Sequence, residues 1–159
     1  MNSRMLSFFN ENNILRREQF GFRKNISTTL ASFNVIKSIC ESLNNRIPVT
    51  TIFLDMSKAY DLVLHQNLLD KLEKYGTRGN AHNLIKSYLR SRQQRTEISR
   101  IVKCHNKSTK IIYTSEFREN QSCAIPQGSI IGPLLFLSYI NDLPDSTINQ
   151  CVLFADDTT

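Results

Sequence analysis

The chain has 159 residues, of which 20 are Lys or Arg and 14 are Asp or Glu, so its formal net charge is +6. This length corresponds to about one domain. A hydrophobic content of 40% with four cysteines and five glycines excludes a chain that is disordered throughout, a disulfide scaffold and a collagen. No apolar run approaches the ~20 residues of a membrane span, and no signal peptide is recognisable. Scattered cysteines without a C-x-x-C pair indicate reduced thiols.

Five segments are predicted as helices; the first is expected to be the end of a helix that begins before residue 1, and the second to fourth carry apolar residues on one face, as in an amphipathic helix. In the fourth of them, Leu84, Ile85 and Leu89 are expected on one apolar stripe. Helices are predicted at residues 4–9, from Ser27 to Leu43 with Ser27 or Asn25 as N-cap, at 66–75 before Gly76, at 80–89, and from Gly132 to Asn141 before Pro144.

Short apolar and β-branched runs predict the strands, and two of them run into aspartates. Asp55 follows the first run, which we expect to be largely buried, and Asp156 and Asp157 follow the last. Strands are predicted at residues 49–54 and 151–155, with a hairpin from 96–102 and 110–117. The sequence therefore predicts a mixed α+β fold.

Three carboxylates at strand ends repel one another and are costly to bury, unless a cation compensates them. Mg²⁺ prefers such oxygen ligands, and two Mg²⁺ ions can stabilise the attacking and leaving oxygens of a phosphoryl transfer. The alternative is that the aspartates are ordinary turn residues. A second metal hypothesis, Cys104 and His105 with Cys123, lacks a fourth ligand. Excess positive charge favours an anionic partner, although +6 also suits an ordinary basic protein.

The segments around these aspartates resemble a known family. Residues 53–63 read FLDMSKAYDLV, 124–136 read AIPQGSIIGPLLF, and 154–157 read FADD. In this order they resemble the three central palm motifs of reverse transcriptases, and most closely those of non-LTR (LINE-type, jockey-like) retrotransposons. Supporting matches are EQFGFR at 18–23, KLEKYG at 71–76 and NDLP at 141–144, so the resemblance covers nearly the whole chain.

The resemblance implies the catalytic roles. Asp55 matches the first metal-binding aspartate, Asp156 the second, and Asp157 the neighbouring carboxylate that supports the site. The implied cofactor is Mg²⁺, as two ions, with Mn²⁺ as an alternative. The implied reaction is RNA-directed DNA synthesis, the transfer of a deoxynucleotide to a primer 3′-OH. The implied partners are an RNA template, a DNA primer and deoxynucleoside triphosphates, with no membrane, inside the cell in cytoplasm and nucleus.

The resemblance also assigns nucleotide contacts. Tyr60 matches the aromatic steric gate against a ribose 2′-OH, with a plain core aromatic as the alternative. The backbone at Lys58 and Ala59 would face the triphosphate. Gln127 and Gly128 would lie against the incoming nucleotide and template, although these two residues alone also signal a turn.

Three basic residues are candidates for contacts to nucleic acid. They are Arg23, Arg92 and Arg95, and the alternative for the arginines between 90 and 100 is a solvated face. Phe20 and Phe22, which flank Gly21, are expected to pack inside the fold rather than to stack on bases.

The implied architecture is a right-hand polymerase in which a small antiparallel palm sheet packs on helices. Residues of about 1–48 and 66–122 would form fingers and connecting helices, and about 49–65 and 123–159 the palm. We expect the chain to be truncated, without the upstream fingers segment, the second strand of the Asp-Asp hairpin, or the thumb. Ala124 departs from the glycine usual in the family. The alternatives are an inactive remnant that at most binds RNA, and a maturase or telomerase palm.

Overall fold

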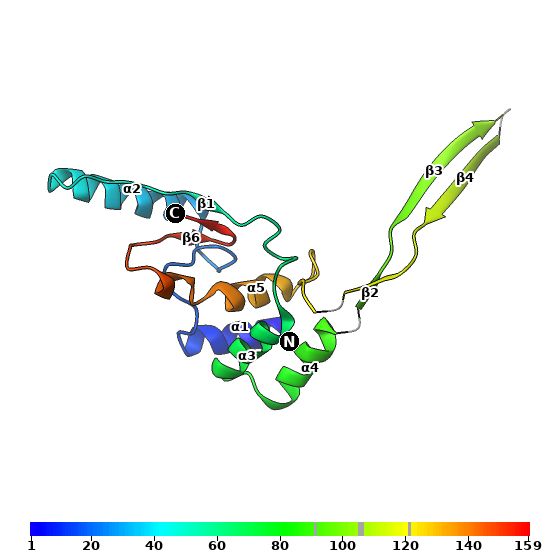
Figure 1. Ribbon diagram of the computed structural model, residues 1–159, viewed down its shortest axis with the longest axis horizontal. Helices are drawn as coiled ribbons and strands as arrows, with labels where there is room; N and C mark the ends of the chain where they lie inside the picture. The colour runs from blue at the N-terminus through cyan, green and yellow to red at the C-terminus, as the bar shows by residue number, and fades with distance from the viewer. Residues whose placement is uncertain (91, 105–106, 121) are drawn as a thin grey trace.

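The structure is a computed structural model that describes residues 1–90, 92–104, 107–120 and 122–159. It mixes helices with small antiparallel sheets, as expected (Figure 1). In chain order the elements are α1 (Asn2–Glu11), α2 (Thr28–Asn44), β1 (Leu54–Asp55), α3 (His65–Lys74), α4 (Gly79–Leu89), β2 (Arg92–Gln94), β3 (Glu97–Cys104), β4 (Lys107–Thr114), β5 (Arg118–Asn120), α5 (Gly132–Ile140), the 3₁₀ helix η1 (Leu143–Ser146), β6 (Leu153–Phe154) and β7 (Asp157–Thr158).

The five predicted α-helices are confirmed, and local signals explain their ends. The Ser27 hydroxyl accepts a hydrogen bond from the Leu30 N–H at 3.3 Å and caps α2. Gly76 follows α3 with a φ of +93°, the left-handed conformation that ends many helices. Pro133 lies in the first turn of α5, where its missing N–H costs nothing. None of the described helices has the length and hydropathy of a membrane span.

Helix α5 is the centre of the hydrophobic core. This helix is apolar on nearly every side, so neighbouring elements must bury it on all of its faces. Helices α1, α3 and α4 supply buried side chains to the same cluster, including Phe9, Leu68 and Leu89. In Figure 1 these helices gather below α5. Burial of apolar surface therefore holds the helical body together.

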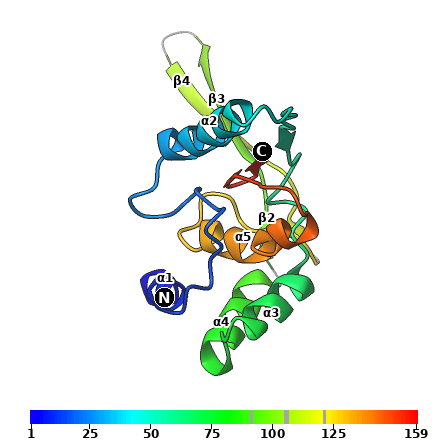
Figure 2. The ribbon, with the colours of Figure 1, turned by 90° about the vertical axis from the view of Figure 1, so that its left-hand side faces the viewer.

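The β6–β7 hairpin and β1 form a three-stranded antiparallel sheet in the order β1-β7-β6. Both views place this sheet between α5 on one side and α2 on the other (Figure 2). A second feature is the β3–β4 ribbon, which extends away from the body from a base formed by β2 and β5 (Figure 1). This confirms the predicted hairpin.

The expected burial of residues 49–54 is wrong. Only Leu54 of this run is in β1, and Ile52 and Phe53 are 65% and 75% exposed. β1 pairs with β7 through Leu54 opposite Thr158 and Asp55 opposite Asp157, and residues 49–53 belong to no strand. The predicted strand at 49–54 is therefore wrong in extent as well as in burial, because the strand runs over Leu54–Asp55.

The predicted strand at 151–155 is shorter, because Ala155 already belongs to the turn at a φ of +58°. The second strand of this hairpin, which we expected to be absent, begins at Asp157. Its pairing continues where Val152 and Thr159 exchange two backbone hydrogen bonds of 2.7 and 2.9 Å. Thr159 is therefore paired on this side.

Two smaller expectations also fail. Leu84 is 56% exposed, because the residues of α4 that turn toward the core are Ile85 and Leu89, with Tyr88 partly buried beside them, so the stripe is narrower than the apolar content suggested. Phe22 is 53% exposed, because its left-handed backbone, with a φ of +53°, carries the ring outward.

Cys40, Cys123 and Cys151 are free thiols, as expected. The metal hypothesis on Cys104 and His105 lies outside the described residues and side chains.

Candidate active site

The two aspartate-bearing segments come together in the three-stranded sheet. In the antiparallel β1–β7 pair, Asp55 is directly opposite Asp157. Asp156 is the second residue of the two-residue turn between β6 and β7. Residues 55 and 156 are about 100 positions apart in the chain, so only tertiary pairing brings them to one end of one sheet.

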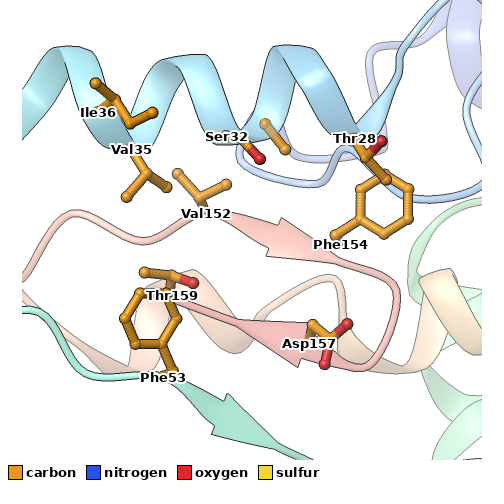
Figure 3. A pocket seen from close by; sticks show the side chains of 10 residues that line it. Thr28, Ser32, Val35, Ile36, Phe53, Val152, Phe154, Asp157 and Thr159 are labelled. Carbon is orange, nitrogen blue, oxygen red and sulfur yellow. The ribbon is translucent and has the colours of Figure 1, made fainter.

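The register decides which carboxylates share a face. Opposed residues of an antiparallel pair project from the same side of the sheet, so Asp55 and Asp157 do so. This side faces α2: Asp157, Phe53 and Phe154 line a hollow of about 370 Å³ together with α2 residues (Figure 3). Asp156, in contrast, lies at the tip of the hairpin.

Tyr60 lies on the other side of this tip. Its ring stacks on Phe136 of α5, with centroids 4.6 Å apart and planes 14° from parallel. Burial of the ring, first, and the negative charge of Asp156, second, raise the pKa of the Tyr60 phenol above its ordinary value. The Asp156 carboxylate is therefore near enough for its charge to act on the phenol.

A pH titration should detect this proximity. Tyr60, followed as the tyrosinate absorbance that is lost in Tyr60→Phe, should ionise above the ordinary range of a tyrosine. Asp156→Asn should lower this pKa partly, because burial is the larger cause and stays. Since the pKa of Tyr60 is raised in the folded state, its neutral phenol contributes to the free energy of unfolding below pH ~10. This contribution is lost as the pH rises through the folded-state pKa. An unchanged titration in Asp156→Asn would show that the two groups are not neighbours.

The segment at 122–129 is tied to the segment after Asp55 by backbone hydrogen bonds. The Ile125 N–H donates to the Tyr60 carbonyl at 2.9 Å, and the Ala124 N–H donates to the Val63 carbonyl at 3.0 Å. Ala124 has a φ of +83°, a conformation that suits glycine and strains alanine. The alanine that stands here in place of the family's usual glycine is therefore tolerated at the cost of backbone strain.

Gln127 and Gly128 are the exposed tip of a turn. The Ser129 N–H donates to the Pro126 carbonyl at 3.3 Å and closes it. Gly128 has a φ of +77°, and a Cβ there would meet no atom within 4 Å. The positive φ, and not crowding inside the chain, is what favours glycine at this position. The space in front of this turn is open to a ligand.

Lys58 and Ala59 also lie in a turn. Lys58 has a φ of +54°, and the Ala59 N–H donates to the Met56 carbonyl at 3.2 Å. The N–H of Ala59 is thus already engaged in the turn, while the Lys58 side chain is exposed.

The three basic candidates have local partners, and Arg23 belongs to a different segment from Arg92 and Arg95. One guanidinium nitrogen of Arg23 donates to the carbonyls of Arg16 and Gln19, at 3.0 and 3.2 Å. Arg92 lies over the ring of Tyr88, and Arg95 over that of Phe117, at 4.9 and 5.0 Å from the ring centroids. Arg23 therefore braces its own loop, whereas Arg92 and Arg95 lie at the base of the β3–β4 ribbon.

Sequence reasoning missed three residues that hold the motif segments together. Buried Asn141 accepts a hydrogen bond from the Arg16 N–H at 2.9 Å and donates one to the Ile14 carbonyl at 2.8 Å. Lys71 pairs with Asp142 at 2.5 Å. Buried Gln19 contacts the turn that carries Asp156. Each of the three lies inside a segment that matched the family, which was the available signal.

The acidic residues suit a hard divalent cation by their chemistry. Within the described ranges, no Lys or Arg nitrogen lies within 4.0 Å of a carboxylate oxygen of Asp55, Asp156 or Asp157. Nor do any three His, Cys, Asp or Glu side chains of the described part converge closely enough to form a metal site. The oxygen donors and the uncompensated charge thus fit Mg²⁺, while the three carboxylates are not drawn into one coordination sphere.

Comparisons with known proteins identify relatives of the chain. The chain is 29% identical over 142 residues to the probable RNA-directed DNA polymerase from transposon BS, and 27% identical over 159 residues to that from transposon X-element, both of Drosophila melanogaster. It is 26% identical over 145 residues to the RNA-directed DNA polymerase from mobile element jockey of the same species. These alignments cover 89, 97 and 91% of this chain.

The chain spans only 14 to 16% of the length of these curated relatives. The family described as "Reverse transcriptase (RNA-dependent DNA polymerase)" nevertheless matches residues 1–159. The resemblance to the enzymes of jockey-like, non-LTR elements is thereby confirmed. This chain belongs to the reverse transcriptase family.

Proposed function

We propose that this chain forms the catalytic part of an RNA-directed DNA polymerase of a non-LTR retrotransposon. The observation that carries the proposal is the sheet register, which sets Asp55 opposite Asp157 with Asp156 in the adjoining turn. The reaction is template-directed transfer of a deoxynucleotide onto a primer 3′-OH.

Asp55 and Asp156 would hold two divalent ions, Mg²⁺ or Mn²⁺, with Asp157 as the supporting carboxylate. The uncompensated charge of this group supports the assignment. When bound, such ions stabilise the charge on the attacking and leaving oxygens of a phosphoryl transfer. The contribution of the chain would be to bring the carboxylates to one end of one sheet, with Asp55 and Asp157 on paired strands and Asp156 in the adjoining turn, and cation binding would draw them closer together.

The nucleotide would lie between Tyr60 and the turn at Gln127 and Gly128. Tyr60 would exclude a ribose 2′-OH, because stacking on Phe136 prevents its ring from turning aside. The open space at Gly128 supports close approach of a base or sugar. Lys58, next to Ala59, would place a cation near the triphosphate.

Template and primer would contact Arg92 and Arg95, with a smaller part for Arg23, whose guanidinium also braces its loop. The distribution of charge supports this assignment. Residues 90–120 hold eight of the 20 basic and three of the 14 acidic residues, so this segment carries +5 of the total +6. Phosphates favour such a surface electrostatically. By this proposal, residues 49–65 and 123–159 form the palm, and the remainder forms fingers and connecting helices.

A primer-extension assay tests the proposal. The protein encoded by the longest reading frame that contains these residues should extend a DNA primer on an RNA template when deoxynucleotides and Mg²⁺ are present. Extension should stop when EDTA removes the Mg²⁺. Retention of RNA without extension would favour the second candidate, an inactive remnant that binds RNA through the basic 90–120 segment. A protein that neither extends the primer nor retains RNA would contradict both functions.

A further inference from the structure

The turn that carries Asp156 cannot hold its own conformation. Its first residue, Ala155, has a φ of +58° and is buried. This left-handed region is unfavourable for alanine, whose Cβ crowds the following carbonyl. The neighbouring chain must therefore stabilise the turn.

That stabilisation comes from the Glu18–Gly21 loop, more than 130 residues earlier in the chain. Gln19, which is 2% exposed, accepts a hydrogen bond from the Ala155 N–H at 3.0 Å through Oε1. The same oxygen accepts one from the Gly21 N–H at 2.7 Å. A single side-chain atom thus joins the loop to the turn.

Backbone contacts fix the loop against β6 on both sides of Gln19. The Leu153 N–H donates to the Glu18 carbonyl at 2.8 Å, and the Phe20 N–H donates to the Leu153 carbonyl at 2.7 Å. A Cβ on Gly21 would lie only 2.3 Å from the Ala155 nitrogen. The loop therefore lies directly against the backbone of the turn, where no side chain fits.

The bonding pattern assigns the Gln19 amide. Both partners are N–H donors, so the atom that they share must be the oxygen. The Nε2 of Gln19 is then a buried donor that has no hydrogen-bond partner among the described residues. The amide nitrogen gains nothing from this environment, so the contribution of Gln19 to the turn is made through its oxygen.

We propose that Gln19 is a positioning residue for Asp156, which it fixes by accepting the Ala155 N–H with its side-chain oxygen. The inference rests on the proposed polymerase function only for its kinetic consequence. Because Gln19 is 2% exposed, it would act through the turn and not by contact with substrate or cation. Losing the oxygen should displace the Asp156 carboxylate and so weaken cation binding and turnover, while nucleotide binding at Tyr60 and Gly128 is left unchanged.

The structural test uses the purified 159-residue chain. Gln19→Met keeps the length of the side chain without an acceptor oxygen, whereas Gln19→Glu keeps an oxygen. Amide exchange at Ala155 should rise about tenfold or more in Gln19→Met and stay near wild type in Gln19→Glu, with core amides of α5 unchanged in both.

Gln66→Met is the matched control, since its exposed amide bonds only to Asp70 on the same helix. The proposal would be overturned if the Ala155 amide exchanged equally fast in wild type and Gln19→Met. It would also be overturned if Gln19→Met and Gln19→Glu lost equal protection at this amide. If Gln19→Met does not fold, Gln19→Asn replaces it, because the shorter amide stays polar but draws the oxygen out of reach. Protection at Ala155 in that variant would likewise refute the proposal.

The kinetic test uses the longest reading frame that contains these residues. Gln19→Met should lower kcat about tenfold and raise the Mg²⁺ concentration for half-maximal rate, with the deoxynucleotide KM changed less than about twofold and with recovery in Gln19→Glu. A rise in KM alone would contradict a positioning role. If the wild-type polymerase is inactive, the proposed function fails, and the exchange of Ala155 still decides the role of Gln19.

Discussion

Asp156→Ala should lower Mg²⁺-dependent primer extension by about 10³-fold, because by the proposed function it removes a carboxylate that would hold the catalytic cations, and a loss of this size corresponds to several kcal/mol. The fold should survive. Asp156 lies at the tip of the hairpin, and the bonds that fix this hairpin, from Gln19 to Ala155 and between Val152 and Thr159, involve none of its side-chain atoms. The measurement is the initial rate of incorporation on a primed RNA template over a range of Mg²⁺ concentrations.

Asp70→Ala is the matched control for this loss. Asp70 is an exposed aspartate of α3 whose carboxylate accepts a hydrogen bond from Gln66 at 2.8 Å, away from the sheet. It removes the same charge from the chain and should leave the rate unchanged. An Asp156→Ala enzyme that keeps more than about a tenth of the wild-type rate would remove Asp156 from the catalytic group.

Phe136→Ala should give the largest loss of stability, about 3–5 kcal/mol in the free energy of unfolding. Phe136 is 1% exposed at the centre of α5, and its ring is the surface on which Tyr60 stacks. The loss combines the transfer of a large apolar side chain with the cavity that is left. For a chain of this size it corresponds to a fall in Tm of about 6–20 °C. Urea unfolding followed by far-UV circular dichroism measures it.

Phe33→Ala provides the comparison, because it deletes the same ring from a side chain of α2 that is 59% exposed. Its effect should stay within about 0.5 kcal/mol. Similar losses in the two variants would mean that α5 is not the centre of the core. Phe136→Ala should also free the Tyr60 ring, so its effect on the Tyr60 titration should be larger than that of Phe33→Ala.

The helices were predictable because their signals are local. The Ser27 cap, the spacing of Leu68 and Leu72, and Gly76 beyond the helix end all act within a few residues, and the structure agrees with each. The segments that hold Asp55 and Asp156 were recognisable for a related reason, since a motif is a short contiguous pattern. Their joining into one sheet could only be inferred from the family.

Burial and register could not be predicted in the same way. The run before Asp55 has the composition of a buried strand, yet Ile52 and Phe53 are exposed and only Leu54 of the run is in the sheet. Likewise, the sequence does not show that Asp55 shares a face with Asp157 and that Asp156 lies at the tip. A shift of one residue in pairing would exchange the two faces.

By itself, then, the sequence determined the helices, the hairpin ribbon and the residues of the candidate site, because propensity, capping and motif spacing are properties of neighbouring residues. Only the tertiary structure decided how the site is held. Ala155 adopts a left-handed turn because Gln19 and Gly21 contact it from the other end of the chain. Rules based on neighbouring residues cannot predict a hydrogen bond between residues 136 positions apart. The energy of such a bond depends on packing that only the folded chain provides.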